Sequence, residues 1–361
     1  MSRFRVGIIG CGRPSRTEGA TGVGMAHTHA RGYLASSDCE LVAAADIKRE
    51  NLDVFCDRYD IPGRYLDHKD MLARANLDIV SVCVWPHLHA PMVIDAAQAE
   101  VKAVHCEKPM ATTWGEAKRM VSVCNEYSVQ LTVNHQRRFG RPFRRAKELV
   151  DTGAVGELTR LEAFTSNLYD WGTHWFDMMF YYNDESPVEW VIGQIDAREG
   201  RTIFGVAVEG QGLSFFRWQN GVFGLMLTGS RVHRLKKGEE AREQGCENRL
   251  IGTDGVIEVG VEGGPKLRFK NVATGGRWEE DNEGEIHNYD FVISAISDLV
   301  DALKTGREPE LAGRKALQAT ELIFATYESS RRRGRIDLPL EIDDCPFVSM
   351  LEAGALSNAA G

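Results

Sequence analysis

The chain has 361 residues, of which 43% are hydrophobic and 26% are charged, and its formal net charge is −9. This length is sufficient for two domains that each bury a core, and the composition is that of an ordinary globular protein. The negative charge argues against nucleic acid or an anionic membrane as a partner. No stretch is apolar over the length of a membrane span, so the sequence predicts no membrane association.

The cysteines and histidines indicate neither disulfides nor a metal centre. Eight cysteines include no C-x-x-C pair, and several lie in apolar runs, such as Cys83 in "IVSVCVW". This pattern predicts reduced, buried thiols in a cytoplasmic protein. The histidine pairs at 27/29 and 87/89 are two residues apart, so their side chains point to different sides of a helix and are poorly placed to share a metal. The first strand begins near Phe4, which leaves no room for a signal peptide.

Strand and helix patterns alternate through the first third of the chain. The apolar character of the strand segments is continuous, which is typical of a parallel sheet covered on both faces. We therefore predict an α/β fold that begins with a Rossmann domain, a doubly wound parallel sheet, over residues 1–136. The expected strands are 4–9, 40–46, 78–84, 101–106 and 129–133, and the expected helices are 25–36, 48–59, 67–75, 87–99 and 113–127.

Longer strand-like runs replace this alternation after residue 136. Turn signals such as "QNG" (219–221) and "TDG" (253–255) predict antiparallel hairpins. Two amphipathic helices are expected at about 285–305 and 313–332. We predict an α+β domain with an open, mainly antiparallel sheet over residues 137–340. Residues 341–361 are expected to form a C-terminal tail whose end is frayed.

A glycine loop follows the first strand in "GIIGCGRPSRTEGATGVGMAHTHA" (7–30). Gly10, Cys11 and Gly12 resemble the start of a dinucleotide fingerprint, but a helix pattern resumes only at Met25. We interpret residues 13–23 as an insertion into the loop. The insertion either lies over the cofactor, with Arg13 and Arg16 as candidate phosphate contacts, or is a solvated loop.

Asp46 closes the second strand, where a Rossmann fold places the acid that binds the adenine ribose. It follows Gly12 by 34 residues instead of roughly 20, and removing the insertion restores the usual interval to within a few residues. The alternative role is capping of the next helix. A carboxylate here favours NAD by repelling the 2′-phosphate of NADP, although the neighbouring Lys48 and Arg49 leave NADP possible.

Further motifs identify a family. "VCVWPHLHAPMVIDAAQAEVKAVHCEKPMATTWGEAKRM" (82–120) contains a Trp-Pro-x-x-His segment and a Glu-Lys-Pro segment, and "NHQRRF" (134–139) and "DWGTH" (170–174) follow. With the glycine loop, these motifs occur in the order found in the Gfo/Idh/MocA oxidoreductases, which the chain resembles from residue 4 to about 182. The chain departs from this family in its insertion and in lacking the glycines that often precede the last motif.

The resemblance implies a nicotinamide cofactor and three catalytic residues. His174 is expected to remove the hydroxyl proton, Lys108 to stabilise the reacting oxygen, and Asp170 to orient His174 from the same face of a helix. The alternative for each is an ordinary turn or surface residue. The implied cofactor site comprises Gly10, Cys11, Gly12, Met25, Asp46, Trp85, Pro86, His89, Glu107, Lys108 and Gln136, with no metal.

Three residues are candidate substrate contacts. Tyr169 and Trp171 flank Asp170 and either form an apolar wall for a sugar ring or pack in the core. Arg138, where the first domain joins the second, is a candidate partner for a substrate oxygen or a cofactor phosphate.

The predicted activity is hydride transfer between nicotinamide and a sugar, polyol or inositol-like hydroxyl compound. Two alternatives use the same fold: an NAD-dependent glycosidase or lyase that oxidises a sugar transiently, and a non-catalytic NAD-binding regulatory protein. The expected partners are a small carbohydrate-like substrate and further copies of the chain, as a homodimer or homotetramer.

Overall fold

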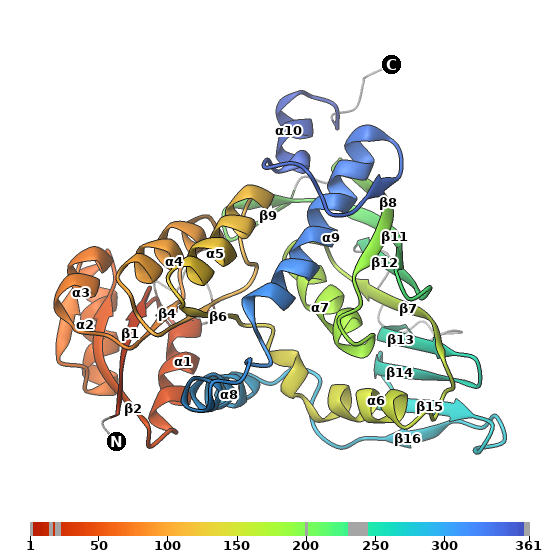
Figure 1. The fold of residues 1–361 in the computed structure, drawn as a ribbon, viewed down its shortest axis with the longest axis horizontal. Coiled ribbons are helices and arrows are strands. Elements are labelled where there is room, and N and C mark those ends of the chain that lie inside the picture. The colour runs from red at the N-terminus through yellow and green to blue at the C-terminus, as the bar shows by residue number, and fades with distance from the viewer. Residues whose placement is uncertain (1–2, 14–16, 19–22, 199–200, 230–244, 357–361) are drawn as a thin grey trace. The chain divides into compact units, whose positions relative to one another are not determined.

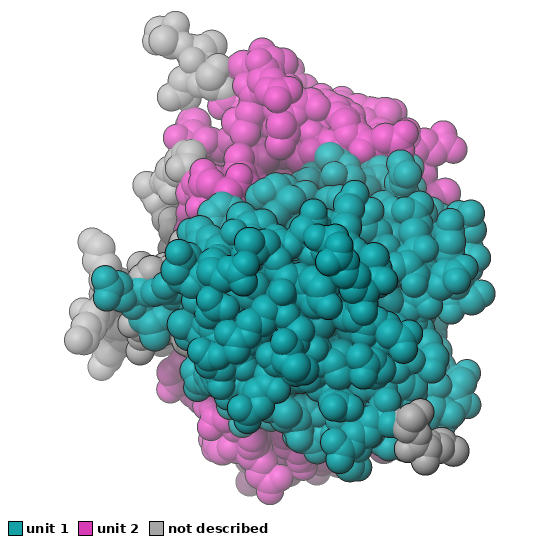
Figure 2. Space-filling view, turned by 90° about the vertical axis from the view of Figure 1, so that its left-hand side faces the viewer, with its two compact units in different colours: residues 1–136, 289–317 teal, residues 137–288, 318–361 magenta. Residues whose placement is uncertain are grey.

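The computed structural model of the chain describes residues 3–13, 17–18, 23–198, 201–229 and 245–356. They form two compact units, coloured separately in Figure 2. Unit 1 comprises residues 1–136 and 289–317, and unit 2 comprises residues 137–288 and 318–361. The structure therefore assigns residues 289–317 to the first unit, whereas the sequence pattern placed them in the second domain.

Unit 1 is built on a six-stranded parallel sheet with the strand order β3-β2-β1-β4-β5-β6, as predicted for a Rossmann domain. Of the central strands, β4 is buried throughout and β1 is buried from Val6 to Ile9, as their continuous apolar runs predict. The strands are β1 (Phe4–Ile9), β2 (Cys39–Ala45), β3 (Gly63–Tyr65), β4 (Ile79–Val82), β5 (Ala103–Cys106) and β6 (Gln130–Val133).

Helices cover both faces of this sheet. In Figure 1, α4 and α5 lie together on one face, and α1 lies beside α8 on the other. A capping box between Thr113 and Glu116 begins α5. The helices are α1 (Met25–Leu34), α2 (Arg49–Tyr59), α3 (His68–Arg74), α4 (His89–Gln98), α5 (Trp114–Glu126) and α8 (Phe291–Thr305), with the 3-10 turns η1 (Pro86–Leu88) and η2 (Gln136–Phe139).

Helix α8 explains why residues 289–317 belong to unit 1. Its apolar side contributes Val292, Ile296 and Leu299 to the core that α1 shares with β1 and β2. The approach is close, since a Cβ atom added to Gly32 of α1 would lie 2.5 Å from Ile296 Cδ1. Amphipathicity predicted the helix, but a sequence pattern does not specify which sheet an apolar face covers.

Unit 2 contains a nine-stranded sheet with the order β16-β15-β14-β13-β7-β12-β11-β8-β17. Only β7 and β12 pair in parallel, so the predicted mainly antiparallel sheet is confirmed. Its strands are β7 (Leu158–Thr165), β8 (Val188–Asp196), β11 (Gln211–Trp218), β12 (Phe223–Gly229), β13 (Cys246–Gly252), β14 (Gly255–Val261), β15 (Leu267–Asn271), β16 (Glu279–Asp281) and β17 (Ile336–Asp337); β9 (Arg201–Ile203) and β10 (Val206–Val208) form a separate hairpin.

The helices of unit 2 are α6 (Arg141–Asp151), α7 (Gly172–Tyr182), α9 (Gly313–Arg332), which begins in unit 1, and α10 (Pro346–Glu352). Helix α9 packs against β8, where Ser329 Oγ accepts a hydrogen bond from Gly193 N at 2.8 Å. Phe347 and Met350 of α10 are buried, so the predicted C-terminal tail carries a packed helix. None of the helices in the described part of the chain is long and apolar enough to cross a membrane.

The packing of α8 can be tested with Ile296→Ala. Removing a fully buried side chain from the core shared by α1 and α8 should lower the free energy of unfolding by about 2–5 kcal/mol. Urea denaturation measures this loss, and the exposed substitution Leu351→Ala serves as the control. A loss below about 0.5 kcal/mol, the size of a typical surface effect, would show that α8 does not belong to this core.

Candidate functional site

The glycine loop begins directly after β1, and the backbone conformation at Gly10 and Gly12 explains why glycine occupies both positions. Gly10 has φ +87°, and a Cβ atom there would lie 2.6 Å from Val84 Cγ1 and 3.0 Å from the Cys83 backbone. Gly12 has φ +55°, and among the described residues the nearest atom to an added Cβ is Gly24 Cα at 3.9 Å. Gly10 thus permits close packing, and Gly12 leaves room for a ligand to approach the backbone.

The two glycines that flank residues 13–23, Gly12 and Gly24, lie next to each other. A Cβ atom built on Gly12 would lie 3.9 Å from Gly24 Cα, and α1 starts at Met25 immediately after Gly24. This geometry agrees with an insertion into an otherwise ordinary loop. Arg13 donates hydrogen bonds to Asn51 Oδ1 at 2.9 Å and to the Glu18 carbonyl at 2.7 Å. Arg16 lies outside the described residues.

The Asp46 carboxylate binds the glycine loop itself. Its Oδ2 accepts hydrogen bonds from Cys11 N at 2.9 Å and Gly12 N at 3.1 Å, and its Oδ1 accepts one from Lys48 N at 2.8 Å. The last bond ends at Lys48, the N-cap residue of α2, so Asp46 does not cap the N–H groups of the first turn of that helix. Oδ2 has both lone pairs engaged and Oδ1 retains one, so Oδ1 can also accept a ribose hydroxyl.

His89 is a correction to the predicted cofactor contacts. Its ring is fully buried, with Nδ1 2.7 Å from the Pro109 carbonyl oxygen and Nε2 3.1 Å from the Val84 carbonyl oxygen. Both ring nitrogens therefore face backbone carbonyl oxygens, which leaves neither for a cofactor, and burial lowers the pKa of His89. In the same motif Trp85 is 41% exposed and Pro86 is buried at the start of η1. Of these three, only Trp85 presents a side chain to solvent.

Glu107 also lies within a buried network. Its Oε1 accepts hydrogen bonds from His29 Nε2 at 2.8 Å and Asn134 Nδ2 at 2.7 Å, and its Oε2 accepts one from Lys108 N at 3.3 Å. Burial alone would raise the pKa of Glu107, but hydrogen bonds from His29 and Asn134, with the charges of His29 and Lys108, lower it to about 2. The Glu107 carboxylate, predicted as a cofactor contact, is thus engaged by His29, Asn134 and the backbone N–H of Lys108.

His29 is the functional residue of this network that sequence reasoning missed. A histidine in the first turns of a helix is usually expected to be a packing residue. The sequence does not show that its hydrogen-bond partners come from other elements. His29 Nδ1 lies 3.1 Å from Ser81 Oγ, which lies 2.8 Å from Tyr33 Oη. The network therefore ties α1 to β4 and to the end of β5.

The two other cofactor candidates, Met25 and Gln136, are each the first residue of a helical segment. Met25 is the first residue of α1 and is half-buried. Gln136 begins η2, and its buried Oε1 has no hydrogen-bond partner among the described residues. An unsatisfied amide oxygen is costly unless a ligand or water completes it.

In unit 2, Asp170 and His174 follow β7. Asp170 lies in the turn before α7, so the predicted arrangement of both residues on one helical face is wrong. Asn167 organises this turn: its Oδ1 accepts a hydrogen bond from Asp170 N at 2.6 Å, and its carbonyl accepts one from Gly172 N at 2.8 Å. A Cβ atom at Gly172 would lie 2.9 Å from the Asn167 carbonyl oxygen, which explains the glycine between Asp170 and His174.

Arg138 does not serve as a substrate contact. Its side chain is fully buried, donates two hydrogen bonds to the Asp177 carboxylate at 2.8 and 2.7 Å, and donates a third to Glu185 Oε1 at 2.5 Å. These carboxylates raise the pKa of Arg138 despite its burial. The sequence position of Arg138 predicted a substrate contact, but its guanidinium forms ion pairs with Asp177 and Glu185 inside unit 2.

The predicted aromatic wall divides between core and surface. Tyr169 is 4% exposed and therefore a core residue, which corrects its assignment to the substrate. Trp171 is 37% exposed, and its ring centroid lies 6.4 Å from that of His174 and 5.7 Å from that of His287. Only Trp171 remains available as a wall for a ligand.

Arg137, His287 and Glu247 support Trp171. The Arg137 guanidinium lies 5.4 Å from the Trp171 ring centroid, and its Nη2 lies 2.9 Å from His287 Nδ1. His287 Nε2 lies 2.9 Å from Glu247 Oε1. Burial lowers the pKa of Arg137 to about 10, which leaves it charged at neutral pH. His287 and Glu247 carried no motif, and they are far from Trp171 in sequence, so only the fold brings them together.

Comparison with known proteins identifies the family. Residues 4–135 match the GFO_IDH_MocA model, an oxidoreductase family with an NAD-binding Rossmann fold. D-apiose dehydrogenase of Paraburkholderia graminis is 24% identical over 99% of this chain and 95% of its own length. Myo-inositol 2-dehydrogenase of Thermotoga maritima is also 24% identical, over 93% of this chain and 98% of its own length. Residues 4–135 therefore match the NAD-binding Rossmann domain of the Gfo/Idh/MocA oxidoreductases, and nearly the whole chain is similar to two dehydrogenases.

The fold of this oxidoreductase is shared with solved structures. An oxidoreductase from Agrobacterium radiobacter, crystallised with NAD+, L-tartaric acid and magnesium, superimposes with a TM-score of 0.74 at 20% identity and covers 93% of this chain and 98% of its own. The predicted resemblance, nicotinamide cofactor and dehydrogenase class are confirmed.

The glycine loop of this oxidoreductase fits NAD. The open backbone at Gly12, the absence of acidic residues from the first turn of α1 and the position of Asp46 at the end of β2 together suit a pyrophosphate and a ribose. The described residues contain no group of three or more His, Cys, Asp or Glu side chains arranged to hold a metal ion.

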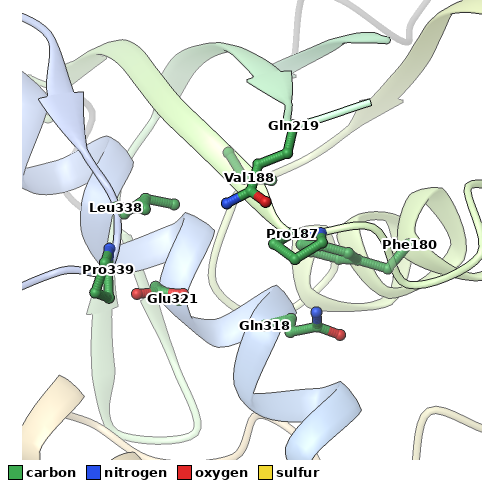
Figure 3. Close-up of a pocket in the computed structure, with 8 residues that line it drawn as sticks. All are labelled: Phe180, Pro187, Val188, Gln219, Gln318, Glu321, Leu338 and Pro339. Carbon is green, nitrogen blue, oxygen red and sulfur yellow. The ribbon is translucent and has the colours of Figure 1, made fainter. Parts of the chain in front are cut away.

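Two cavities are lined by residues other than the predicted catalytic residues Lys108, Asp170 and His174. One in unit 2, of about 140 Å³, is lined by Phe180, Pro187, Val188, Gln219, Gln318, Glu321, Leu338 and Pro339 (Figure 3). One in unit 1, of about 240 Å³, lies beside α1 and α2 and includes His27, Arg31, Arg58 and Tyr59. Neither contains a predicted catalytic residue.

The Glu107 network makes a prediction about pH. Because the pKa of Glu107 is lowered from 4.5 to about 2, its ionised form stabilises the fold above pH 4.5, and this contribution is lost as the pH falls toward 2. Glu107→Gln should therefore destabilise the protein at pH 6, and the difference from wild type should shrink at pH 3. Urea denaturation at both pH values measures it, with the exposed Glu126→Gln as control. A difference that grows on acidification would contradict the network.

Proposed function

We propose that this oxidoreductase oxidises a hydroxyl carbon of a sugar, polyol or inositol-like compound. One observation carries the proposal: an exposed indole, Trp171, lies beside His174 at the start of α7. Aromatic faces suit the apolar C–H faces of sugar rings, and an imidazole suits their hydroxyls. The names of the two dehydrogenase relatives, which act on apiose and myo-inositol, support the same class.

In the proposed mechanism each residue has one role. NAD, when bound, supplies the hydride acceptor. His174 takes the proton from the substrate hydroxyl, and the Lys108 ammonium stabilises the negative charge that develops on that oxygen. Asp170 keeps the imidazole oriented and stabilises its charged form. The reverse steps reduce a carbonyl, so the direction depends on the substrate and cofactor ratio.

The cofactor contacts are proposed from the sequence positions that remain available. Gly10, Cys11 and Gly12 offer backbone to the pyrophosphate, with Met25 starting the helix beneath it. Asp46 accepts a ribose hydroxyl and so favours NAD over NADP. Trp85 and Pro86 border the cofactor, Gln136 Oε1 accepts a hydrogen bond from the nicotinamide carboxamide, and Glu107 acts through Lys108.

Location and assembly are retained as proposals. All eight cysteines are free, in keeping with a cytoplasmic protein. We propose a homodimer or homotetramer, which size-exclusion chromatography with light scattering measures directly. A molar mass of a single chain at micromolar protein concentration would exclude the proposed homodimer and homotetramer.

The catalytic assignment is tested by Lys108→Ala and His174→Ala. Loss of the charge stabiliser or the base should lower kcat by about 10²–10⁴-fold, measured as NADH formation with a panel of aldoses, inositols and uronates. NAD+ affinity, measured by calorimetry, should change little for His174→Ala. Lys102→Ala, an exposed lysine paired with Asp78, is the matched control.

Two outcomes would overturn this function. Normal turnover in both variants would remove Lys108 and His174 from the mechanism. Release of an aglycone from a glycoside with no accumulation of NADH would instead favour the transient-oxidation alternative.

A further inference from the structure

A fully buried glutamate in unit 2 has no role in the function described above. Glu209 follows β10 and has no exposed surface. In the part of the chain that the structure describes, no cation lies within ion-pair distance of it. Glutamate is almost never fully buried without a charged partner, because desolvating its carboxylate is costly. Burial accordingly raises the pKa of Glu209, despite the hydrogen bonds that oppose this.

Three donors converge on this carboxyl group. Oε1 accepts a hydrogen bond from the Leu168 backbone N–H and one from Thr228 Oγ1 at 3.2 Å. Oε2 accepts one from Tyr327 Oη at 2.7 Å. The donors come from the loop after β7, from β12 and from α9, so a single side chain joins three separate parts of unit 2.

Leu168 connects Glu209 to the proposed catalytic loop. Leu168 lies between Asn167, whose side chain binds Asp170 N, and Asp170 itself. Asn167 also accepts the hydrogen bond from Gly172 N that begins α7, two residues before His174. Fixing the Leu168 N–H therefore fixes the backbone from which Asp170 and His174 project.

Packing restrains the Leu168 side chain in the same place. A Cβ atom added to Gly212 of β11 would lie 3.2 Å from Leu168 Cδ1 and 2.9 Å from Thr228 Oγ1. The loop thus lies directly on β11 while Glu209 holds its backbone. The Leu168 side chain and the Leu168 N–H give two independent restraints on one residue.

We propose that Glu209 is a positioning residue that sets the placement of Asp170 and His174 through its hydrogen bond to Leu168. The proposal rests on the function proposed for Asp170 and His174. A carboxyl group that served only stability would be replaced with advantage by a neutral group, since burying an ionised carboxylate destabilises the fold. Retaining it is consistent with a requirement for a strong acceptor at the Leu168 N–H.

The test compares Glu209→Leu, Glu209→Gln and Tyr327→Phe. Glu209→Leu removes the acceptor and should lower kcat about tenfold to hundredfold, the effect of a small misplacement of catalytic groups, with NAD+ affinity unchanged. Glu209→Gln retains an oxygen for the Leu168 N–H and should restore most of kcat. Tyr327→Phe, the matched control, removes only the donor to Oε2 and should leave kcat near wild type.

Stability separates positioning from a structural role. Glu209→Gln should have a midpoint of thermal unfolding at pH 8 that is equal to or higher than that of wild type. If Glu209→Leu fails to fold, Glu209→Asp decides, because its shorter side chain keeps the charge but withdraws it from Leu168 and should lower kcat similarly.

The outcomes distinguish this inference from the proposed function. Folded Glu209 variants with wild-type kcat, beside an inactive His174→Ala, would overturn the positioning role alone. Equal loss of kcat in Tyr327→Phe and Glu209→Leu would also overturn it, because the effect would then not pass through Leu168. An active His174→Ala would instead remove the function on which the inference rests.

Discussion

The Asp46 carboxylate, bound by the backbone N–H groups of Cys11 and Gly12, is the interaction on which the cofactor domain depends. It links the end of β2 to the loop after β1, although eleven further residues separate that loop from its helix. Gly24, which precedes α1, lies next to Gly12. This closeness agrees with our prediction that residues 13–23 are an insertion into the loop.

The motifs of this family act largely through buried positioning. His89 lies between the backbone carbonyls of Val84 and Pro109, and Glu107 binds the side chains of His29 and Asn134. Each such polar group is buried with its partners, an arrangement that fixes a single conformation when every member is satisfied. Among the motif residues, Trp85 and Trp171 have side chains that are exposed to solvent.

Sequence reasoning predicted the elements and the family because these depend on local patterns. Continuous apolar strands specified the parallel sheet, and glycines and Asp46 at fixed places specified the cofactor loop. Sequence reasoning could not distinguish residues that contact a ligand from buried residues that hold the structure together. His89, Arg138 and Tyr169 are of the second kind, and only their tertiary partners show it. For the same reason it missed His29, His287 and Glu209, whose partners are distant in sequence. Helix α8 was predicted as a helix but assigned to the wrong domain, since amphipathicity does not identify the surface that it covers.

The central claim, that the interrupted loop holds NAD through Asp46, is tested most directly by calorimetric titration of NAD+ into wild type and Asp46→Ala. Loss of hydrogen bonds to a charged group, about 1.5–3 kcal/mol, should weaken NAD+ binding by about ten- to a hundredfold. Wild type should bind NAD+ more tightly than NADP+, and the variant should lose this preference. Equal NAD+ affinity in both proteins, or no binding to wild type, would contradict the account.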